Sequence, residues 1–282
     1  DKPDEDKPDE DKPDEGDPDE GDPDRSAADD RLLRGALLIA SLDDVDIDVE
    51  AYIERVDEMA SEVREQLDAQ ADEKERLAAL DRYLFQENGF HGGRSEYYHP
   101  ANSHLNRVID DREGLPITLS ILYIELGRRL GLRIDGIGLP GHFVVNHVAA
   151  DGTEQLVDVF DGGTPMSNAE ADALVRANVG RNLVDGDLDP QSTPQILTRV
   201  LRNLMAIAGD KRDGESLLRY ADALVAIDSD SAEFRMMRAQ LRGMTDRRVL
   251  AIEDLRSLLQ AGPPGLNRPA AQQLLDALLE SN

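Results

Sequence analysis

The stretch that decides the fold is GLPITLSILYIELGRRLGLRIDGIGLPGHF, residues 114–143. Its first three residues, Gly-Leu-Pro, interrupt the preceding chain, and residues 117–130 behind them are apolar on most faces of a helix. Gly131 then stands where a glycine commonly ends a helix. The sequence therefore predicts a central helix that is buried on several sides.

Three short runs typical of β-strands follow this predicted helix. They cover residues 133–138, 142–149 and 155–160, with Gly/Pro and Asp-Gly turns between them. Together with the helix, they indicate an α+β fold.

Amphipathic helical patterns precede this centre. Apolar residues recur at three- and four-residue steps within residues 29–41 and 48–70. A third helix is marked by Leu77, Leu80, Leu84 and Phe85. We therefore expect a largely helical segment before the central helix.

Further helical patterns follow a polar linker. They cover residues 193–208, 214–227, 231–241, 247–259 and 268–279. Residues 221–228 align with residues 255–262 at a shift of about 34 residues, which is the period of tetratricopeptide repeats. We expect about two helical hairpins, fewer than the three or so repeats that are stable alone, so this region should pack on the preceding domain.

The N-terminus is a charged repeat. Residues 1–25 consist of DKPDE three times, then GDPDE and GDPDR. Counting −2 for each DKPDE, −3 for GDPDE and −1 for GDPDR, this segment carries −10 of the net −28, which leaves −18 in residues 26–282. Repeated proline and like charge predict a disordered, solubilising tail over residues 1–28. The expected organisation is this tail, a domain over 29–190 and a helical domain over 191–282.

Composition narrows the partners and the compartment. Because the chain is strongly acidic, it would repel a phosphate backbone, and we expect that it does not bind nucleic acid. The same charge favours a protein partner with a basic segment. No apolar run approaches the roughly 20 residues of a membrane-spanning helix, and no signal peptide is visible. The absence of cysteine fits the reducing cytoplasm, and it would equally fit a secreted protein built without disulfides.

Several motifs together closely resemble the SirB1 family. They are YYHPANSHLN at 97–106, GLPITLS at 114–120, Tyr123, RLGL at 129–132 and LPGHF at 139–143. That family has a transglutaminase-like domain followed by tetratricopeptide-like helices. The resemblance, which runs from about Leu32 to Leu279, implies a transglutaminase- or papain-like core with a helical N-terminal segment and C-terminal helical hairpins.

The resemblance also implies where a catalytic site would lie. In active transglutaminase-like enzymes, a nucleophilic cysteine opens the central helix, and two later strands carry a histidine and an aspartate. The matching positions here are Pro116, His142 and Asp158. Because the chain has no cysteine and proline offers no nucleophile, the resemblance implies the His-Asp pair without the thiol chemistry.

The residues around this pair leave two interpretations open. Asp158 can accept a hydrogen bond from one ring nitrogen of His142 and fix its tautomer, which suits a general base, or the histidine can be structural. Thr118 and Ser120 lie within about a turn of the missing nucleophile and are candidate hydrolase nucleophiles. Helix capping or packing explains both hydroxyls as well.

A second set of residues is predicted to bind a ligand rather than to react. Asn102, Ser103 and Asn106 carry uncharged hydrogen-bonding groups that suit a peptide backbone, although loop capping also accounts for them. Tyr123 can line a groove, with Tyr97 and Tyr98, or pack half-buried. Pro116 and His142 complete this set.

We expect neither a metal nor another cofactor. The five histidines are His91, His99, His104, His142 and His147. Their spacings match no standard ligand set, and His142 and His147 would face opposite sides of an unbroken strand.

The function favoured by the sequence is non-catalytic binding of a peptide or protein, by the cleft around His142 and Asp158 and by the C-terminal helical surface. The alternative is a hydrolase or acyltransferase in which His142 is the base, Asp158 orients it, and Ser120, Thr118 or water attacks. A third hypothesis is a structural regulator whose cleft neither binds a ligand nor catalyses a reaction.

Overall fold

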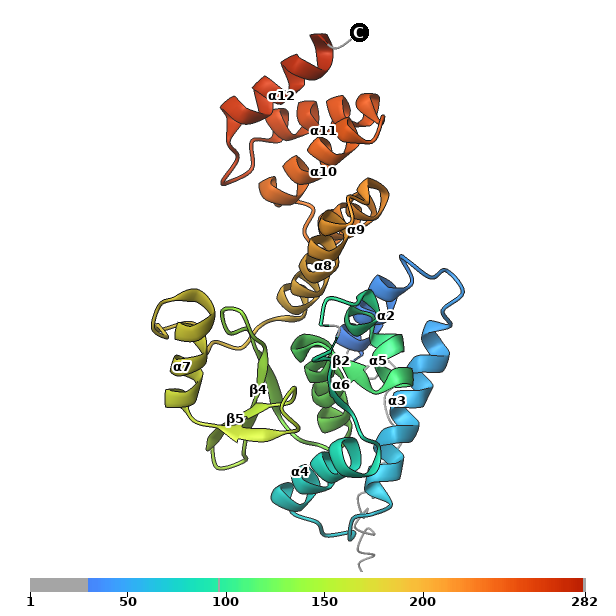
Figure 1. Ribbon diagram of the computed structural model, residues 1–282, viewed down its shortest axis with the longest axis vertical. Coiled ribbons are helices and arrows are strands. Elements are labelled where there is room, and N and C mark those ends of the chain that lie inside the picture. The colour runs from blue at the N-terminus through green and yellow to red at the C-terminus, as the bar shows by residue number, and fades with distance from the viewer. Residues whose placement is uncertain (1–29, 96, 281–282) are drawn as a thin grey trace, which may run out of the picture.

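The computed structural model describes residues 30–95 and 97–280, so the predicted tail over residues 1–28 lies outside the described residues. The predicted α+β fold is confirmed, with helices packed around a central helix, α6, and a four-stranded sheet beside it (Figure 1). Within the described residues, no helix combines the length and the apolar character needed to cross a membrane.

Helix α6 (Pro116–Arg129) begins and ends as the sequence predicts. Pro116 occupies the first turn, where its missing N–H costs nothing. The Oγ1 atom of Thr118 accepts a hydrogen bond from the N–H of Leu115 at 3.0 Å and donates one to the carbonyl oxygen of Asn102 at 2.7 Å. At the other end Gly131 adopts φ of 71°, a left-handed conformation that glycine takes without strain.

The sheet is an antiparallel meander in the order β3-β4-β5-β6. Its strands are β3 (Ile134–Ile137), β4 (Val144–Val148), β5 (Glu154–Asp158) and β6 (Thr164–Met166). The first three match the predicted runs, and the short fourth strand was not predicted. Helix α6 packs closely on this sheet because Gly127 leaves room for Ile134: a Cβ atom at Gly127 would lie 2.3 Å from Cδ1 of Ile134.

The N-terminal helices differ from the prediction at their ends. They are α2 (Arg31–Ala40), α3 (Val49–Arg64), α4 (Glu73–Asp81) and a π-helical turn, η1 (Arg82–Glu87). The prediction that one helix extends to residue 70 is wrong, because α3 ends at Arg64. The next helix starts afresh at Asp72, whose side chain and Glu75 cap it reciprocally.

Four short elements before α6 and one helix after the sheet were not predicted. They are β1 (His91–Gly92), η2 (Pro100–Ser103), α5 (Leu105–Asp111), β2 (Glu113–Gly114) and α7 (Asn168–Val179). Strands β1 and β2 pair in parallel beside the start of α6. The four elements before α6 carry too few residues for a period to be recognised.

The five predicted C-terminal helices are present. They are α8 (Thr193–Asp210), α9 (Gly214–Ile227), α10 (Ala232–Met244), α11 (Arg248–Ala261) and α12 (Arg268–Glu280). Figure 1 shows them rising from the body of the molecule, in orange to red. Val200, Leu201 and Leu204 of α8 are buried in the main hydrophobic core, so this region packs on the preceding domain as expected.

A partly buried carboxylate, that of Asp43, attaches α9 to the N-terminal helices. Asp43 accepts hydrogen bonds from Arg219 at 2.7 Å and from the hydroxyl of Tyr220, and it lies 3.0 Å from Nε2 of His104. Burial alone would raise the pKa of Asp43, but these hydrogen bonds outweigh it and hold the pKa well below its usual range. The first two C-terminal helices are therefore fixed against the core.

Candidate functional site

The structure brings His142 and Asp158 together. His142 lies two residues before β4, Asp158 ends β5, and the antiparallel pairing of these strands places the two side chains side by side. Nε2 of His142 lies 2.9 Å from Oδ2 of Asp158. Because an ionised carboxylate only accepts hydrogen bonds, Nε2 of His142 is the donor in this contact.

The carboxylate of Asp158 is itself held in place. Its other oxygen, Oδ1, accepts the backbone N–H groups of Phe160 at 3.0 Å and Asp161 at 3.2 Å. Only 11% of the His142 side chain and 12% of the Asp158 side chain are exposed. The pair is therefore rigid and nearly dry, which suits an orienting interaction.

A cavity of about 150 Å³ lies beside this pair. It is lined by Tyr97, Pro116, Ile117, Gly141, His142, Phe143, Arg199 and Asn203. Pro116 thus shares a cavity with His142, at the place where the resemblance put the missing nucleophile. Among these lining residues the only hydroxyl is the phenol of Tyr97, whose pKa is raised by burial and by the neighbouring Tyr98.

Neither Thr118 nor Ser120 lines this cavity. The hydroxyl of Thr118 is engaged in capping α6, as described above, so the capping interpretation accounts for it. Ser120 is fully buried, and its Oγ atom has no hydrogen-bond partner among the residues that the structure describes. A hydroxyl enclosed in the core cannot attack a substrate in the cavity, so both residues lack the access that a nucleophile needs.

The four other residues predicted to bind a ligand lie inside the protein. Asn102, Ser103 and Asn106 are at most 5% exposed, and Tyr123 is completely buried. The hydroxyl of Tyr123 donates to Asp81 at 2.8 Å. Their expected contact with a ligand is corrected accordingly: these side chains are enclosed in the protein interior.

An aromatic wall separates the His142 cavity from a second one. The ring of Phe160 stands edge-on to His142, with centroids 6.2 Å apart, and edge-on to Tyr97, at 6.1 Å. Its position depends on Gly92 of β1, where a Cβ atom would lie 2.5 Å from the ring. Phe160 is therefore held against both neighbours by close packing.

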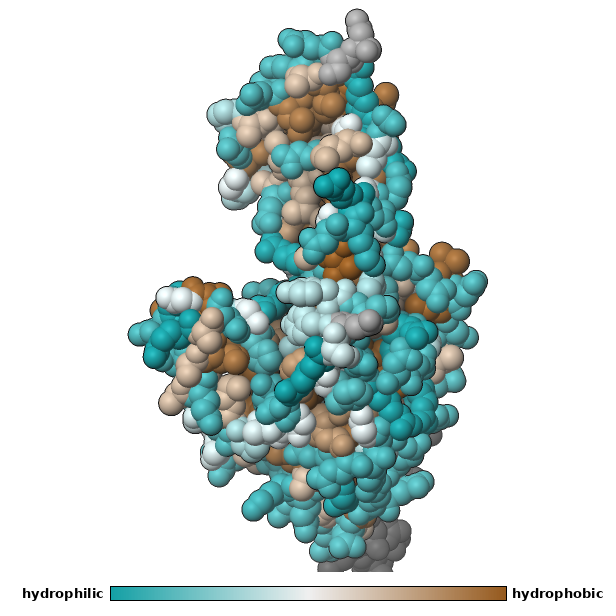
Figure 2. Space-filling model, viewed as in Figure 1, coloured by the Kyte–Doolittle hydropathy of each residue, from teal (hydrophilic) through white to brown (hydrophobic). Residues whose placement is uncertain are grey.

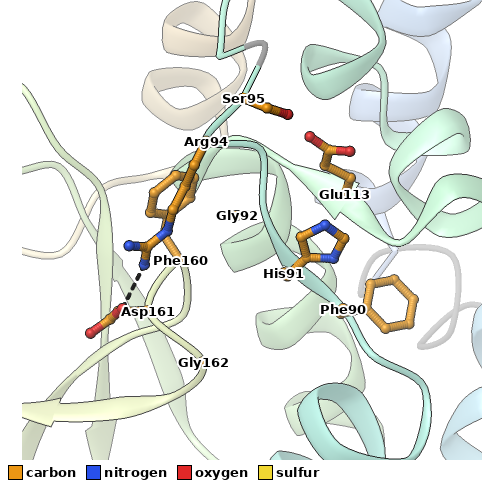
Figure 3. A pocket seen from close by; sticks show the side chains of 9 residues that line it. All are labelled: Phe90, His91, Gly92, Arg94, Ser95, Glu113, Phe160, Asp161 and Gly162. Carbon is orange, nitrogen blue, oxygen red and sulfur yellow. Dashed lines mark hydrogen bonds and ion pairs between the residues drawn. The ribbon is translucent and has the colours of Figure 1, made fainter.

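The second cavity has a volume of about 380 Å³ and lies between β1, β2 and the turn after β5 (Figure 3). Arg94 lies over the Phe160 ring, 5.5 Å from its centroid, and forms an ion pair with Asp161 at 2.6 Å. Figure 3 shows the carboxylate of Glu113 close to His91 on the other side. No ion pair or hydrogen bond neutralises the Glu113 side chain within the described residues, so its charge faces the cavity.

Arg199 is a site residue that sequence reasoning missed. Although it belongs to α8, its guanidinium donates to the carbonyl oxygens of Gly138 at 3.1 Å, Leu139 at 3.1 Å and His142 at 2.9 Å. It also lies 5.5 Å from the ring centroid of Phe143. Burial, and then the neighbouring Arg202, lower its pKa. Arg199 therefore holds the loop that carries His142.

The histidines do not gather into a metal site. Each has a different neighbour: Gly89 for His91, Ala101 for His99, Asp43 for His104, Asp158 for His142 and Glu73 for His147. In the part of the chain that the structure describes, no three His, Cys, Asp or Glu side chains are grouped to hold a metal ion.

Known proteins resemble this chain over most of its length. Residues 50–202 match the family model of the transglutaminase-like superfamily, a range that includes Pro116, His142, Asp158 and Arg199. A UPF0162 protein of Xylella fastidiosa (strain 9a5c) is 34% identical over 237 residues, which cover 82% of this chain and 84% of that protein.

Two more distant relatives share the same region. Protein SirB1 of Salmonella typhimurium is 22% identical over 213 residues, covering 75% of this chain and 78% of the relative. Human F-box only protein 21 is 26% identical over 177 residues, which are 58% of this chain but 27% of that longer protein.

Proposed function

Since this chain belongs to the transglutaminase-like superfamily, we propose that it uses the cleft of that fold to bind a peptide or protein partner rather than to transfer acyl groups. The observation that carries the proposal is the presence of Pro116 in the cavity beside His142. A pyrrolidine ring stands where the attacking atom would be, while the imidazole and carboxylate that would serve it are kept.

The remaining hydroxyls do not replace the thiol. Thr118 caps the helix, Ser120 is enclosed in the core, and the phenol of Tyr97 has a raised pKa that keeps it protonated. The hydroxyls of Thr118 and Ser120 do not line the cavity, and a protonated phenol is a poor nucleophile. Binding therefore accounts for the cleft better than covalent catalysis does.

Charge supports a partner with a basic segment. The protein carries a net charge of −28, which attracts cations over long range at low salt. In the second cavity, the carboxylate of Glu113 offers a group that a lysine or arginine side chain recognises.

The C-terminal helices supply a second surface for a partner. Large apolar side chains are exposed where α10, α11 and α12 end or begin: Met244 (80%), Val249 (70%), Leu250 (44%) and Leu279 (45%). Figure 2 shows apolar residues, in brown, on this stack of helices at the top of the view. Exposed apolar groups gathered in this way commonly mark interaction surfaces. We propose the cytoplasm as the setting, with which the cysteine-free composition is consistent.

A second candidate function is hydrolysis by an activated water molecule. The intact His142–Asp158 pair favours it, because Nδ1 of His142 can accept a proton next to an open cavity. Turnover of small ester and amide substrates that is lost in His142→Ala would support this candidate over binding.

The proposal is tested with fluorescent decapeptides rich in lysine and arginine, using anisotropy at low and high salt. We expect Glu113→Lys to weaken binding about tenfold, the usual scale for reversing one charged contact. His142→Ala should also weaken binding. The matched control is Glu54→Lys, which makes the same charge change at an exposed position on α3. Equal affinity of the wild type and all three variants would overturn the proposal.

A further inference from the structure

Arg199 brings a positive charge to the cavity beside His142. Despite the excess of acidic residues, none of its hydrogen bonds within the described residues is made to a carboxylate; all three acceptors are backbone carbonyl oxygens. By contrast Arg202, on the next turn of α8, forms an ion pair with Glu233 at 2.8 Å. The positive charge of Arg199 is therefore left without a neutralising anion beside the cavity.

The guanidinium is also fixed in orientation. A guanidinium has five N–H donors, and the three bonds to the 138–142 loop and the contact with Phe143 hold its plane. Two N–H groups, one on Nε and one on Nη1, make none of these bonds and remain as charged donors for an anion. Preorganisation of this kind reduces the entropy that a ligand loses on binding.

The rest of the cavity suits the end of a peptide. Asn203 lies one turn after Arg199 on α8, and its amide can donate to the same anion. The first turn of α6, at Pro116 and Ile117, contributes the positive end of a helix dipole. A volume of about 150 Å³ corresponds to roughly five water molecules, enough for a carboxylate and a small side chain.

From the position of Arg199, its unneutralised charge and the size of the cavity, we propose that the cavity beside His142 receives a peptide carboxylate. The terminal carboxylate of a partner is the favoured source, and an aspartate or glutamate side chain is the other. This inference rests on the proposed peptide binding and adds the group that the site recognises. The partner would then place a carboxylate at Arg199 and basic side chains near Glu113.

The test uses three synthetic hexapeptide libraries and the full-length protein. The first library has free C-terminal carboxylates and no Asp or Glu, the second is the same library with C-terminal amides, and the third is amidated with one aspartate. Retention on immobilised protein is measured by mass spectrometry. We expect the first library to be retained about tenfold better than the second, the usual gain from a charge-assisted pair.

The variants separate recognition from folding. Asn203→Asp supplies Arg199 with an internal carboxylate and leaves the bonds to the 138–142 loop untouched, so the preference for free carboxylates should fall to within twofold. Arg202→Gln makes the same charge change outside the cavity and should keep the preference. Arg199→Met should remove it too, and its thermal midpoint shows whether loss of the loop contacts has unfolded the protein.

Each outcome bears on the inference. Better retention of the third library than of the first assigns the site to an acidic side chain. Equal retention of the first two libraries, with a loss in Glu113→Lys, refutes the carboxylate site and leaves peptide binding standing. An unchanged preference in Asn203→Asp also refutes the site. No retention of any library would refute both this inference and the proposed function.

Discussion

Replacing Asp158 with alanine should destabilise the protein by about 3 kcal/mol. The side chain accepts three hydrogen bonds, from His142 at 2.9 Å, from the N–H of Phe160 at 3.0 Å and from the N–H of Asp161 at 3.2 Å. Each contributes about 1 kcal/mol net, and bonds to an ionised acceptor contribute more. Because the carboxylate is only 12% exposed, water reaches the freed donors poorly.

Two companion variants make the magnitude interpretable. Asp158→Asn keeps an oxygen for the two backbone N–H groups but loses the charge, so we expect a loss of about 1 kcal/mol. Asp161→Ala removes an exposed ion pair with Arg94 and should cost less than about 0.5 kcal/mol. The predicted order of stability is therefore Asp161→Ala, Asp158→Asn, Asp158→Ala, from most to least stable.

Urea unfolding at pH 7, followed by circular dichroism, gives the three free energies. Nitrogen NMR of the His142 ring adds a local measurement, because removal of the carboxylate should release the Nε2-protonated tautomer. A loss for Asp158→Ala no larger than that for Asp161→Ala would refute the reasoning. The reasoning would also be refuted if the tautomer of the His142 ring were the same in Asp158→Ala as in the wild type.

Two other predictions concern buried carboxylates elsewhere. Burial raises the pKa of Asp81 to about 6 despite the hydrogen bond from Tyr123. The folded protein therefore binds this proton more tightly than the unfolded chain, which stabilises the fold fully below about pH 4, and this stabilisation is lost as the pH rises through 6. The free energy of unfolding of the wild type should therefore fall by up to about 3 kcal/mol between pH 4 and 8. In Asp81→Asn this fall should be absent, so the urea midpoint should change less with pH. Asp254 joins α10 to α11 by accepting from Arg238 and Arg242 at 2.7 Å each. Asp254→Ala should cost about 3 kcal/mol and speed hydrogen exchange in α10–α12; unchanged exchange would contradict it.

The helices with a strong period were predictable, and so was the His-Asp pair. Residues 117–130 and the five C-terminal segments have apolar residues on a helical repeat, and the structure confirms helices there. His142 and Asp158 were identified from the resemblance to transglutaminase-like enzymes, and the antiparallel pairing of β4 and β5 brings them together. The helices depend on local chain geometry, which side-chain pattern controls directly.

The environment of the candidate site was not predictable in the same way. Asn102, Ser103, Asn106 and Tyr123 looked like ligand contacts, yet packing around α6 buries them. Polar residue type says what bonds a side chain can make but not whether those bonds point into the core or into a cavity. Arg199 was overlooked because nothing in a helical pattern distinguishes a cation that reaches another domain.

The sequence by itself determined the buried central helix, the strands after it, the C-terminal helices and the absence of a thiol, because each depends on residue identity or on a period of two to four residues. Only the tertiary structure decided which groups share the cavity with His142. Arg199 and Asn203 reach this cavity from α8, whereas Glu113 of β2 lines the neighbouring cavity. Contacts between residues so far apart in sequence arise from how the elements pack, and no local pattern encodes that packing.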